Sequence, residues 1–165
     1  MFLRTRPASV CDVGLLGSLF GRGVRPAVGR AGTFIQWRGN YLRECRGESF
    51  HTAEILSAAR LHLTRDEPND EGGRSYEAFG VRVMLIPEPN NPHDANALRV
   101  ARPNGRPLAY LARELAVDYH PEIARLAPPV YCYATVRGFS TRDTPLHLGI
   151  WLDLPTARGI AAACS

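Results

Sequence analysis

Lysine is absent from this chain of 165 residues, and all twenty of its strongly basic side chains are arginines. The net charge of +4 is unevenly distributed. Residues 1–46 contain eight arginines and two acids, a balance of +6, whereas residues 47–165 contain twelve arginines and fourteen acids, a balance of −2. Nonspecific binding of phosphate backbones depends on an excess of basic charge, so we do not expect it of the part after residue 46.

Cysteine is sparse, and long apolar runs are missing. The four cysteines are scattered, with no Cys-x-x-Cys pair and no histidine at metal-ligand spacing: Cys11, Cys45, Cys132 and Cys164. This excludes the common zinc motifs and a disulfide framework, and it suits a reducing cytoplasm. No apolar stretch approaches the roughly 20 residues that cross a bilayer. Asp12 interrupts the short N-terminal apolar patch, which argues against an export signal. We therefore expect a cytoplasmic protein with no membrane contact.

Standard catalytic motifs are also missing. The sequence has no G-x-S-x-G, no H-E-x-x-H and no glycine-rich phosphate or dinucleotide motif. The neighbours His93 and Asp94 would point to opposite faces of an extended chain, which is not the arrangement of a catalytic triad. We therefore expect no enzyme, no catalytic residue, no metal and no cofactor.

Three regions differ in composition. Residues 1–40 are rich in glycine and arginine, and we expect them to be a poorly ordered, flexible N-terminal segment. Residues 41–155 alternate strand and helix patterns and are expected to fold as one domain. Residues 156–165 look like a C-terminal tail. Within the domain, the acidic and glycine-rich segment 63–80 is expected to be a surface loop.

Six short segments have the composition or the alternation of strands: 40–48, 81–86, 98–101, 107–111, 129–139 and 146–154. Asn104-Gly105 lies between two of them and is a strong hairpin signal, because both residues tolerate positive φ. Thr52 is expected to cap a short helix. A second helical pattern over 112–126 contains Pro121, which is expected to begin a separate short turn.

This order of elements predicts a mainly β fold with one or two short helices, namely a small, modified OB-like β-barrel. A sandwich or a mixed α+β sheet remains an alternative.

Three motifs in order carry a resemblance to a known family. They are GESFH, EPNNPHDANALRV and NGRPLAYLARELA, and over residues 45–154 the chain resembles the HIRAN domain. That domain stands alone in bacterial proteins and is attached to helicase-like DNA-repair ATPases in eukaryotes. The resemblance implies a noncatalytic DNA-binding module that recognises the 3′-hydroxyl end of single-stranded DNA in DNA repair or stalled-replication processing. Its implied partners are DNA 3′ ends and a helicase, nuclease or other repair protein.

The resemblance also implies roles for individual residues. Asp94 matches the acid that reads the free hydroxyl, while His93 and Phe50 match the aromatic positions that stack on terminal bases. His93 stands where a tyrosine is often found. Base stacking of this kind is worth roughly 1–3 kcal/mol per base and tolerates any sequence.

Backbone contacts are implied for three further residues. Tyr110 matches a polar aromatic position near the DNA backbone, Arg113 matches a phosphate-binding cation, and Asn91 belongs to the loop that touches the terminal nucleotide. Ser49 stands at a position where eukaryotic domains can carry a second arginine, so one phosphate contact is expected to be absent.

Structural explanations compete with each of these roles. Asp94 and Asn96 are also what an Asx turn requires. Phe50 is also placed to pack against the following helix, and Tyr110 is also an ordinary surface residue of a barrel. A protein-interaction adaptor is therefore the alternative function. A third hypothesis, a hydrolase with a metal held by His93, Asp94 and Glu48, has little support from the spacing.

Overall fold

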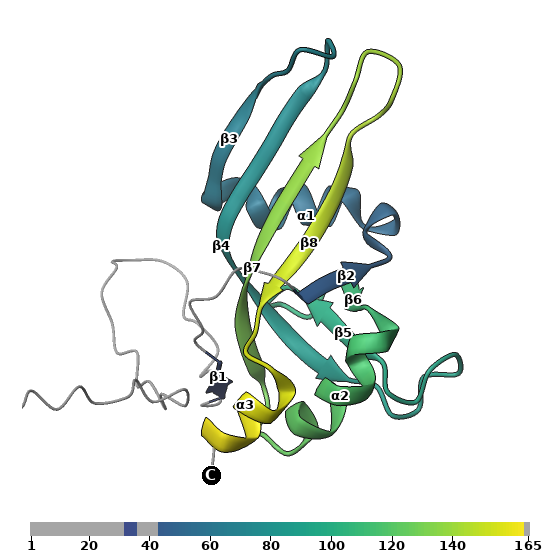
Figure 1. The fold of residues 1–165 in the computed structure, drawn as a ribbon, viewed down its shortest axis with the longest axis vertical. Helices are drawn as coiled ribbons and strands as arrows, with labels where there is room; N and C mark the ends of the chain where they lie inside the picture. Colours follow the sequence, from purple (N-terminus) through teal and green to yellow (C-terminus); the bar gives the residue numbers. More distant parts are fainter. Residues whose placement is uncertain (1–31, 36–42, 164–165) are drawn as a thin grey trace, which may run out of the picture.

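Six antiparallel strands close into a barrel. The computed structural model describes residues 32–35 and 43–163. Its strands are β1 (Thr33–Phe34), β2 (Arg43–Arg46), β3 (Leu63–Pro68), β4 (Arg74–Pro87), β5 (Leu98–Ala101), β6 (Pro107–Leu111), β7 (Val130–Phe139) and β8 (His147–Asp153). The sheet order is β1-β7-β8-β2-β6-β5-β4-β3, and an additional pairing of β7 with β4 closes the barrel (Figure 1). The prediction of a mainly β, OB-like barrel is confirmed.

Alternation of apolar residues places the core inside this barrel. The inward residues of β4 and β7 are fully or almost fully buried: Val81, Val83, Leu85, Val130, Cys132, Ala134 and Val136. β8 contributes Ile150 and Leu152, which are inaccessible to solvent. Each buried aliphatic side chain of this size contributes about 1.5–3 kcal/mol. In the described part of the chain, the barrel interior is therefore filled by apolar side chains, as in other small barrels.

Three α-helices and two 3-10 turns complete the described chain. They are α1 (Thr52–Ala59), α2 (Arg113–Ala124), α3 (Ala157–Ala163), η1 (Glu48–Phe50) and η2 (Arg60–His62). Thr52 is the first residue of α1, not its cap, because His51 holds the cap position and Thr52 donates its hydroxyl to the Ser49 carbonyl at 3.5 Å. Pro121 lies inside α2 instead of starting a new turn. Tyr119 and Ile123 are buried on either side of it and anchor the helix against the barrel.

The segment 63–80 forms two strands, so the prediction of a surface loop is wrong there. β3 and the first half of β4 pair as an antiparallel hairpin, which turns at Asn69. The Asn69 side-chain oxygen accepts hydrogen bonds from the amides of Glu71 and Gly73 at 3.1 and 3.0 Å, and Gly72 has a φ of 72°. β3, the upper parts of β4 and β7, and the first half of β8 project from the barrel as an arm (Figure 1).

Both ends of the predicted domain are extended by further elements. Thr33 and Phe34, inside the segment expected to be poorly ordered, pair in parallel with Val130 and Tyr131 of β7. Residues expected to form the tail include α3, whose Ile160 is buried in the core. The rest of the predicted N-terminal segment, 1–31 and 36–40, lies outside the described residues, so its predicted flexibility is not addressed by the structure. No helix within the described ranges is long and apolar enough to span a bilayer.

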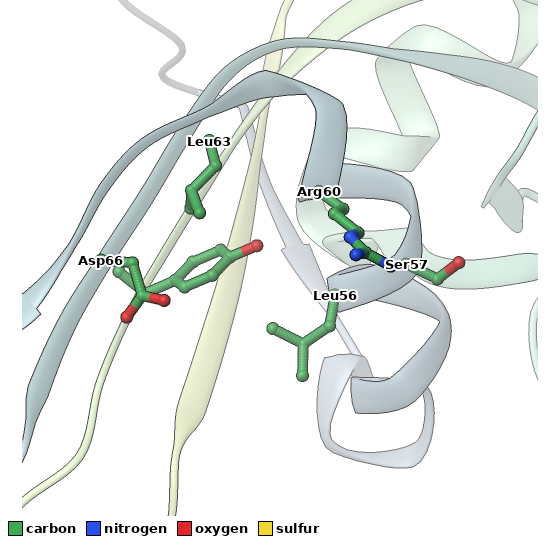
Figure 2. Close-up of a pocket in the computed structure, with 6 residues that line it drawn as sticks. Leu56, Ser57, Arg60, Leu63 and Asp66 are labelled. Atoms are coloured by element: carbon green, nitrogen blue, oxygen red, sulfur yellow. The ribbon is translucent and has the colours of Figure 1, made fainter.

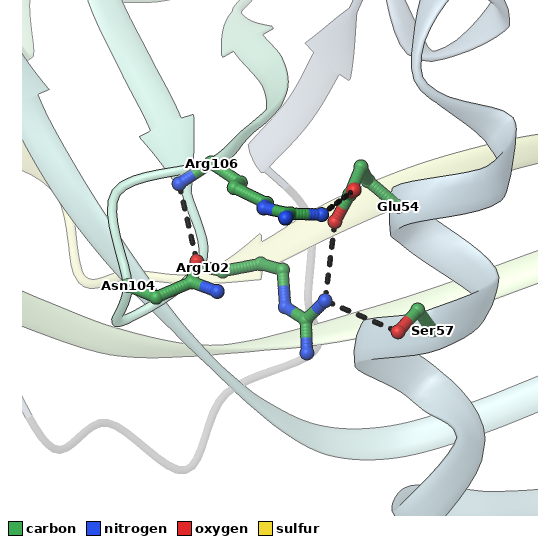
Figure 3. A network of polar contacts seen from close by, with 5 residues as sticks. All are labelled: Glu54, Ser57, Arg102, Asn104 and Arg106. Carbon is green, nitrogen blue, oxygen red and sulfur yellow. Dashed lines mark hydrogen bonds and ion pairs between the residues drawn. The ribbon is translucent and has the colours of Figure 1, made fainter.

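An arginine-rich polar network fixes α1 to the β5–β6 hairpin (Figure 3). Glu54 on α1 accepts hydrogen bonds from Arg106 at 2.6 Å and from Arg102 at 3.1 Å. Arg102 also donates to the Ser57 hydroxyl at 3.1 Å. The predicted Asn104-Gly105 turn is present, with Gly105 at a φ of 87° and the Asn104 side chain accepting the Arg106 amide. Hydrogen bonds from Arg106 and then Arg102 lower the pKa of Glu54.

Candidate functional site

The loop that joins β4 to β5 is organised by Asn91. Its side-chain oxygen accepts the backbone amides of His93 at 3.0 Å and Asp94 at 3.3 Å. Its side-chain nitrogen donates to Glu88 at 3.0 Å, and its own amide donates to the Glu88 carbonyl. Asn91 thus acts on backbone groups as an Asx residue does in tight turns. Its side chain is engaged in hydrogen bonds within the loop, and the contact with a nucleotide that the resemblance implies stays a prediction.

Asp94 closes a second turn directly after the first. One carboxylate oxygen, Oδ1, accepts the amide of Asn96 at 2.9 Å, so the Asx turn weighed from the sequence is present. The other oxygen, Oδ2, lies 3.3 Å from Nε of Arg113. The Asp94 side chain retains 19% of its accessible surface. Its carboxylate is therefore fixed in orientation by the backbone but still reachable from solvent.

Arg113 brings the start of α2 to this loop. Its Nη2 donates to the backbone carbonyl of His93 at 2.7 Å, while its side chain remains 72% exposed. A cation at a helix N-terminus is unfavourable for the helix dipole, so the contacts with the loop supply the local reason for it. The His93 side chain is exposed to solvent.

Tyr110 joins the site from β6 through Glu88. The tyrosine hydroxyl donates to Glu88 Oε2 at 3.2 Å, and burial, followed by the charge of Glu88, raises the pKa of Tyr110. The hydroxyl therefore stays protonated at neutral pH. Glu88 Oε1 lies 3.1 Å from Nε of Arg99, the strand neighbour of Tyr110 on β5, although the angle is not that of a hydrogen bond. Tyr110 is also paired across β2–β6 with Arg46.

Phe50 stands apart from the other predicted residues. It ends η1, which follows β2 after the left-handed residue Gly47. Its side chain is 85% exposed, so the alternative that it packs in the core is wrong. Within the described ranges it makes no ring contact with another aromatic side chain.

The structure therefore gathers five of the six predicted residues around one loop. Asn91, Asp94 and Tyr110 are joined by hydrogen bonds or through Glu88, and Arg113 holds the loop from α2. Glu88 was missed by the sequence analysis although it links the most side chains. A charged residue enclosed by two prolines, Pro87 and Pro89, directly after an apolar strand is the signal that could have identified it.

A pocket of the described residues lies elsewhere, away from the loop. It has a volume of about 450 Å³ and lies between α1 and the β3–β4 hairpin (Figure 2). Its lining residues are Leu56, Ser57, Arg60, Leu63, Asp66 and Tyr76. None of the six predicted residues lines this pocket.

Nothing in the described ranges groups three or more histidine, cysteine or carboxylate side chains as a metal site would require. Glu48, one of the three ligands in the metal-hydrolase hypothesis, directs its carboxylate to the amide of Ile150 at 3.4 Å. Comparisons of the chain with family models, with curated proteins and with solved structures found no significant match.

Proposed function

We propose that the chain is a noncatalytic module that binds single-stranded DNA at its free 3′-hydroxyl end. The proposal combines the resemblance to the HIRAN domain with one observation: the Asp94 carboxylate is held in a fixed orientation, partly exposed, beside the exposed guanidinium of Arg113. A carboxylate can accept the terminal hydroxyl, and an adjacent cation can hold the preceding phosphate. Process and partners, DNA repair and a helicase or nuclease, follow from the resemblance alone.

The chemistry gives selectivity for the end. A hydrogen bond from the 3′-hydroxyl to a carboxylate is charge-assisted and short. A phosphate in the same place would be repelled by Asp94, so the site rejects blocked ends as well as accepting free ones. His93 is exposed next to this position and offers a ring on which a terminal base can stack. Phe50 would reach the same strand only from the η1 side.

Fluorescence anisotropy with two short oligonucleotides, one ending in a 3′-hydroxyl and one in a 3′-phosphate, tests the proposal. Asp94→Asn keeps a side chain that can form the Asx turn and removes the charge. Loss of one charge-assisted hydrogen bond, worth about 1.5–3 kcal/mol, should weaken binding of the hydroxyl end by roughly 10- to 100-fold and abolish the preference.

Asp66→Asn is the matched control, because Asp66 is also paired with an arginine, Arg74, but lies on β3 in the arm. It should leave the preference intact. Equal binding of both ends by the unaltered chain would overturn the proposal and favour the protein-interaction adaptor.

A further inference from the structure

One face of the arm carries aromatic side chains interleaved with an arginine. The inward face of the arm packs Ala78 and Val136 into the core. Strand alternation directs the neighbouring positions to the opposite face. We call this surface the outer arm face; it comprises Phe79, Arg137, Phe139 and His147 on the arm and Trp151 where β8 enters the barrel.

Cross-strand pairing holds these residues together. Phe139 of β7 lies opposite His147 of β8, and Arg137 lies opposite Gly149. A Cβ atom on Gly149 would approach the Trp151 ring to 2.5 Å, so the ring covers the backbone of Gly149. Because Gly149 has no side chain, the Trp151 ring can lie over it and extend along β8 toward Arg137, the residue that pairs with Gly149.

The aromatic groups and the cation are accessible. Phe139 is 54% exposed, which is uncommon for a phenylalanine in a strand. The guanidinium of Arg137 lies 5.8 Å from the centre of the Phe79 ring, in the range of a cation–π contact. Flat apolar rings beside an arginine are the combination that binds single-stranded nucleic acids through base stacking and backbone charge.

The carboxylates near this face are already paired. Glu77 accepts Arg137 at 2.6 Å, and Glu44 of β2 pairs with Arg46. Both pairs are solvent-exposed, and exposed pairs of this type contribute little. A phosphate can therefore replace either carboxylate at small cost. Because each arginine of this face is balanced by a carboxylate, we expect DNA to be held here by base stacking more than by long-range electrostatic attraction.

The outer arm face is continuous with the candidate site. Tyr110 of β6 pairs with Arg46 of β2, and two residues earlier Glu44 of β2 pairs with Trp151 of β8. Alternation around buried Cys45 directs both Glu44 and Arg46 outward. A row of outward residues thus runs from Tyr110 beside the 88–97 loop, over Arg46, to Trp151.

We infer that the outer arm face is a second contact surface for single-stranded DNA, on which bases upstream of the bound 3′ end stack. The inference rests on the proposed function for the direction of the bound DNA: the 3′ end lies at Asp94, and the DNA continues toward its 5′ end over Arg46. It predicts that a longer strand gains affinity from residues that a short one does not reach.

Anisotropy with a trinucleotide and a dodecanucleotide, both with a free 3′-hydroxyl, tests this inference on the full chain. Stacking of a single base corresponds to about fivefold or more in affinity, so the longer strand should bind at least that much more tightly. Phe139→Ala and Arg137→Gln should each remove about fivefold of that gain and leave trinucleotide binding unchanged.

Two matched controls lie on α2 and at its C-terminal cap. Val117→Ala replaces another exposed apolar side chain, and Arg125→Gln removes another exposed arginine that is paired with a glutamate. Neither should alter binding at either length. Thermal unfolding of every variant establishes that the barrel is intact. In a Trp37→Phe chain, Trp151 is the sole tryptophan, and the dodecanucleotide but not the trinucleotide should quench its fluorescence.

The outcomes separate the two proposals. Absence of a length gain, or equal losses at both lengths in Phe139→Ala and Arg137→Gln, would overturn the inference and leave the outer arm face to a protein partner. A length gain that depends on Phe139 and Arg137, combined with equal binding of hydroxyl and phosphate ends, would support the surface and overturn the end recognition at Asp94.

Discussion

Arg113 donates a hydrogen bond of 2.7 Å to the backbone carbonyl of His93, so the first residue of α2 holds the loop between β4 and β5 from outside. The same guanidinium lies beside the Asp94 carboxylate. One side chain therefore fixes both the path of the loop and the electrostatic surroundings of its acid. A substitution of Arg113 is expected to act on loop order and on DNA binding together.

Arg113→Ala should loosen the loop without unfolding the barrel. Because the side chain is largely exposed, its contacts are worth about 1 kcal/mol or less. Hydrogen exchange of the amides of Asp94 and Ala97 should become faster, while amides of buried β7 keep their protection. Arg113→Lys retains the charge but not the forked geometry, and it should restore phosphate attraction only in part. Unchanged exchange in Arg113→Ala would contradict the role of this contact.

Glu54 should make stability depend on pH in the acid range. Its pKa is lowered in the folded protein by hydrogen bonds from Arg106 and Arg102, so the ionised form is favoured by folding. The stabilisation is therefore present above the ordinary glutamate value of 4.5 and is lost as the pH falls through the lowered folded value. Urea unfolding should show a difference between the unaltered chain and Glu54→Gln at neutral pH that shrinks below that value. The pH-dependent part of this difference should be smaller in a chain that also carries Arg106→Gln.

Two glycines should respond differently to alanine. Gly105 has a φ of 87° with no atom within 4 Å of an added Cβ, so Gly105→Ala meets only backbone strain of about 1–2 kcal/mol. At Gly73 an added Cβ would lie 2.0 Å from the carbonyl oxygen of Ser140, which forces the β3–β4 turn away from the end of β7. Gly73→Ala should therefore speed hydrogen exchange at the arm tip, and Gly105→Ala should leave the tip unchanged. The reverse pattern would show that the Ser140 contact does not hold the tip.

The sequence indicated the loop between β4 and β5 better than it indicated the contacts within it. The proline- and asparagine-rich stretch after Ile86 identified the loop, because Asx turns use those residues. The hydrogen bonds from Tyr110 and Asn91 to Glu88 depend on β6 returning beside the loop, which local patterns do not specify. Local patterns also do not predict that Phe50 is exposed, because a phenylalanine beside a helix start usually packs inward.

Strand β3 and helix α3 were not predicted, for different reasons. β3 has every residue exposed, so it lacks the alternation by which strands are found, and its acidic composition resembles a loop. α3 is short and contains Gly159, yet Ile160 finds a place in the core. Alternation along β8 directs Asp153 away from the core residues Ile150 and Leu152, yet it is only 3% exposed. Each of these features is decided by tertiary packing, which is where single-sequence patterns lose information.

Strand β4 runs without interruption from Arg74 at the arm tip to Pro87 at the edge of the 88–97 loop. Ligands that grip these two ends would pull on one strand from opposite directions. Because hydrogen bonds in a sheet lie across the strands, such a load acts in shear on the ladders to β5 and β7 all at once, instead of unzipping them one by one. The register shift between Ala78 and Val81 is the place where this strand can yield first. Under such a load β4 would transmit force between the arm tip and the 88–97 loop, and its bulge would be the most deformable point along it.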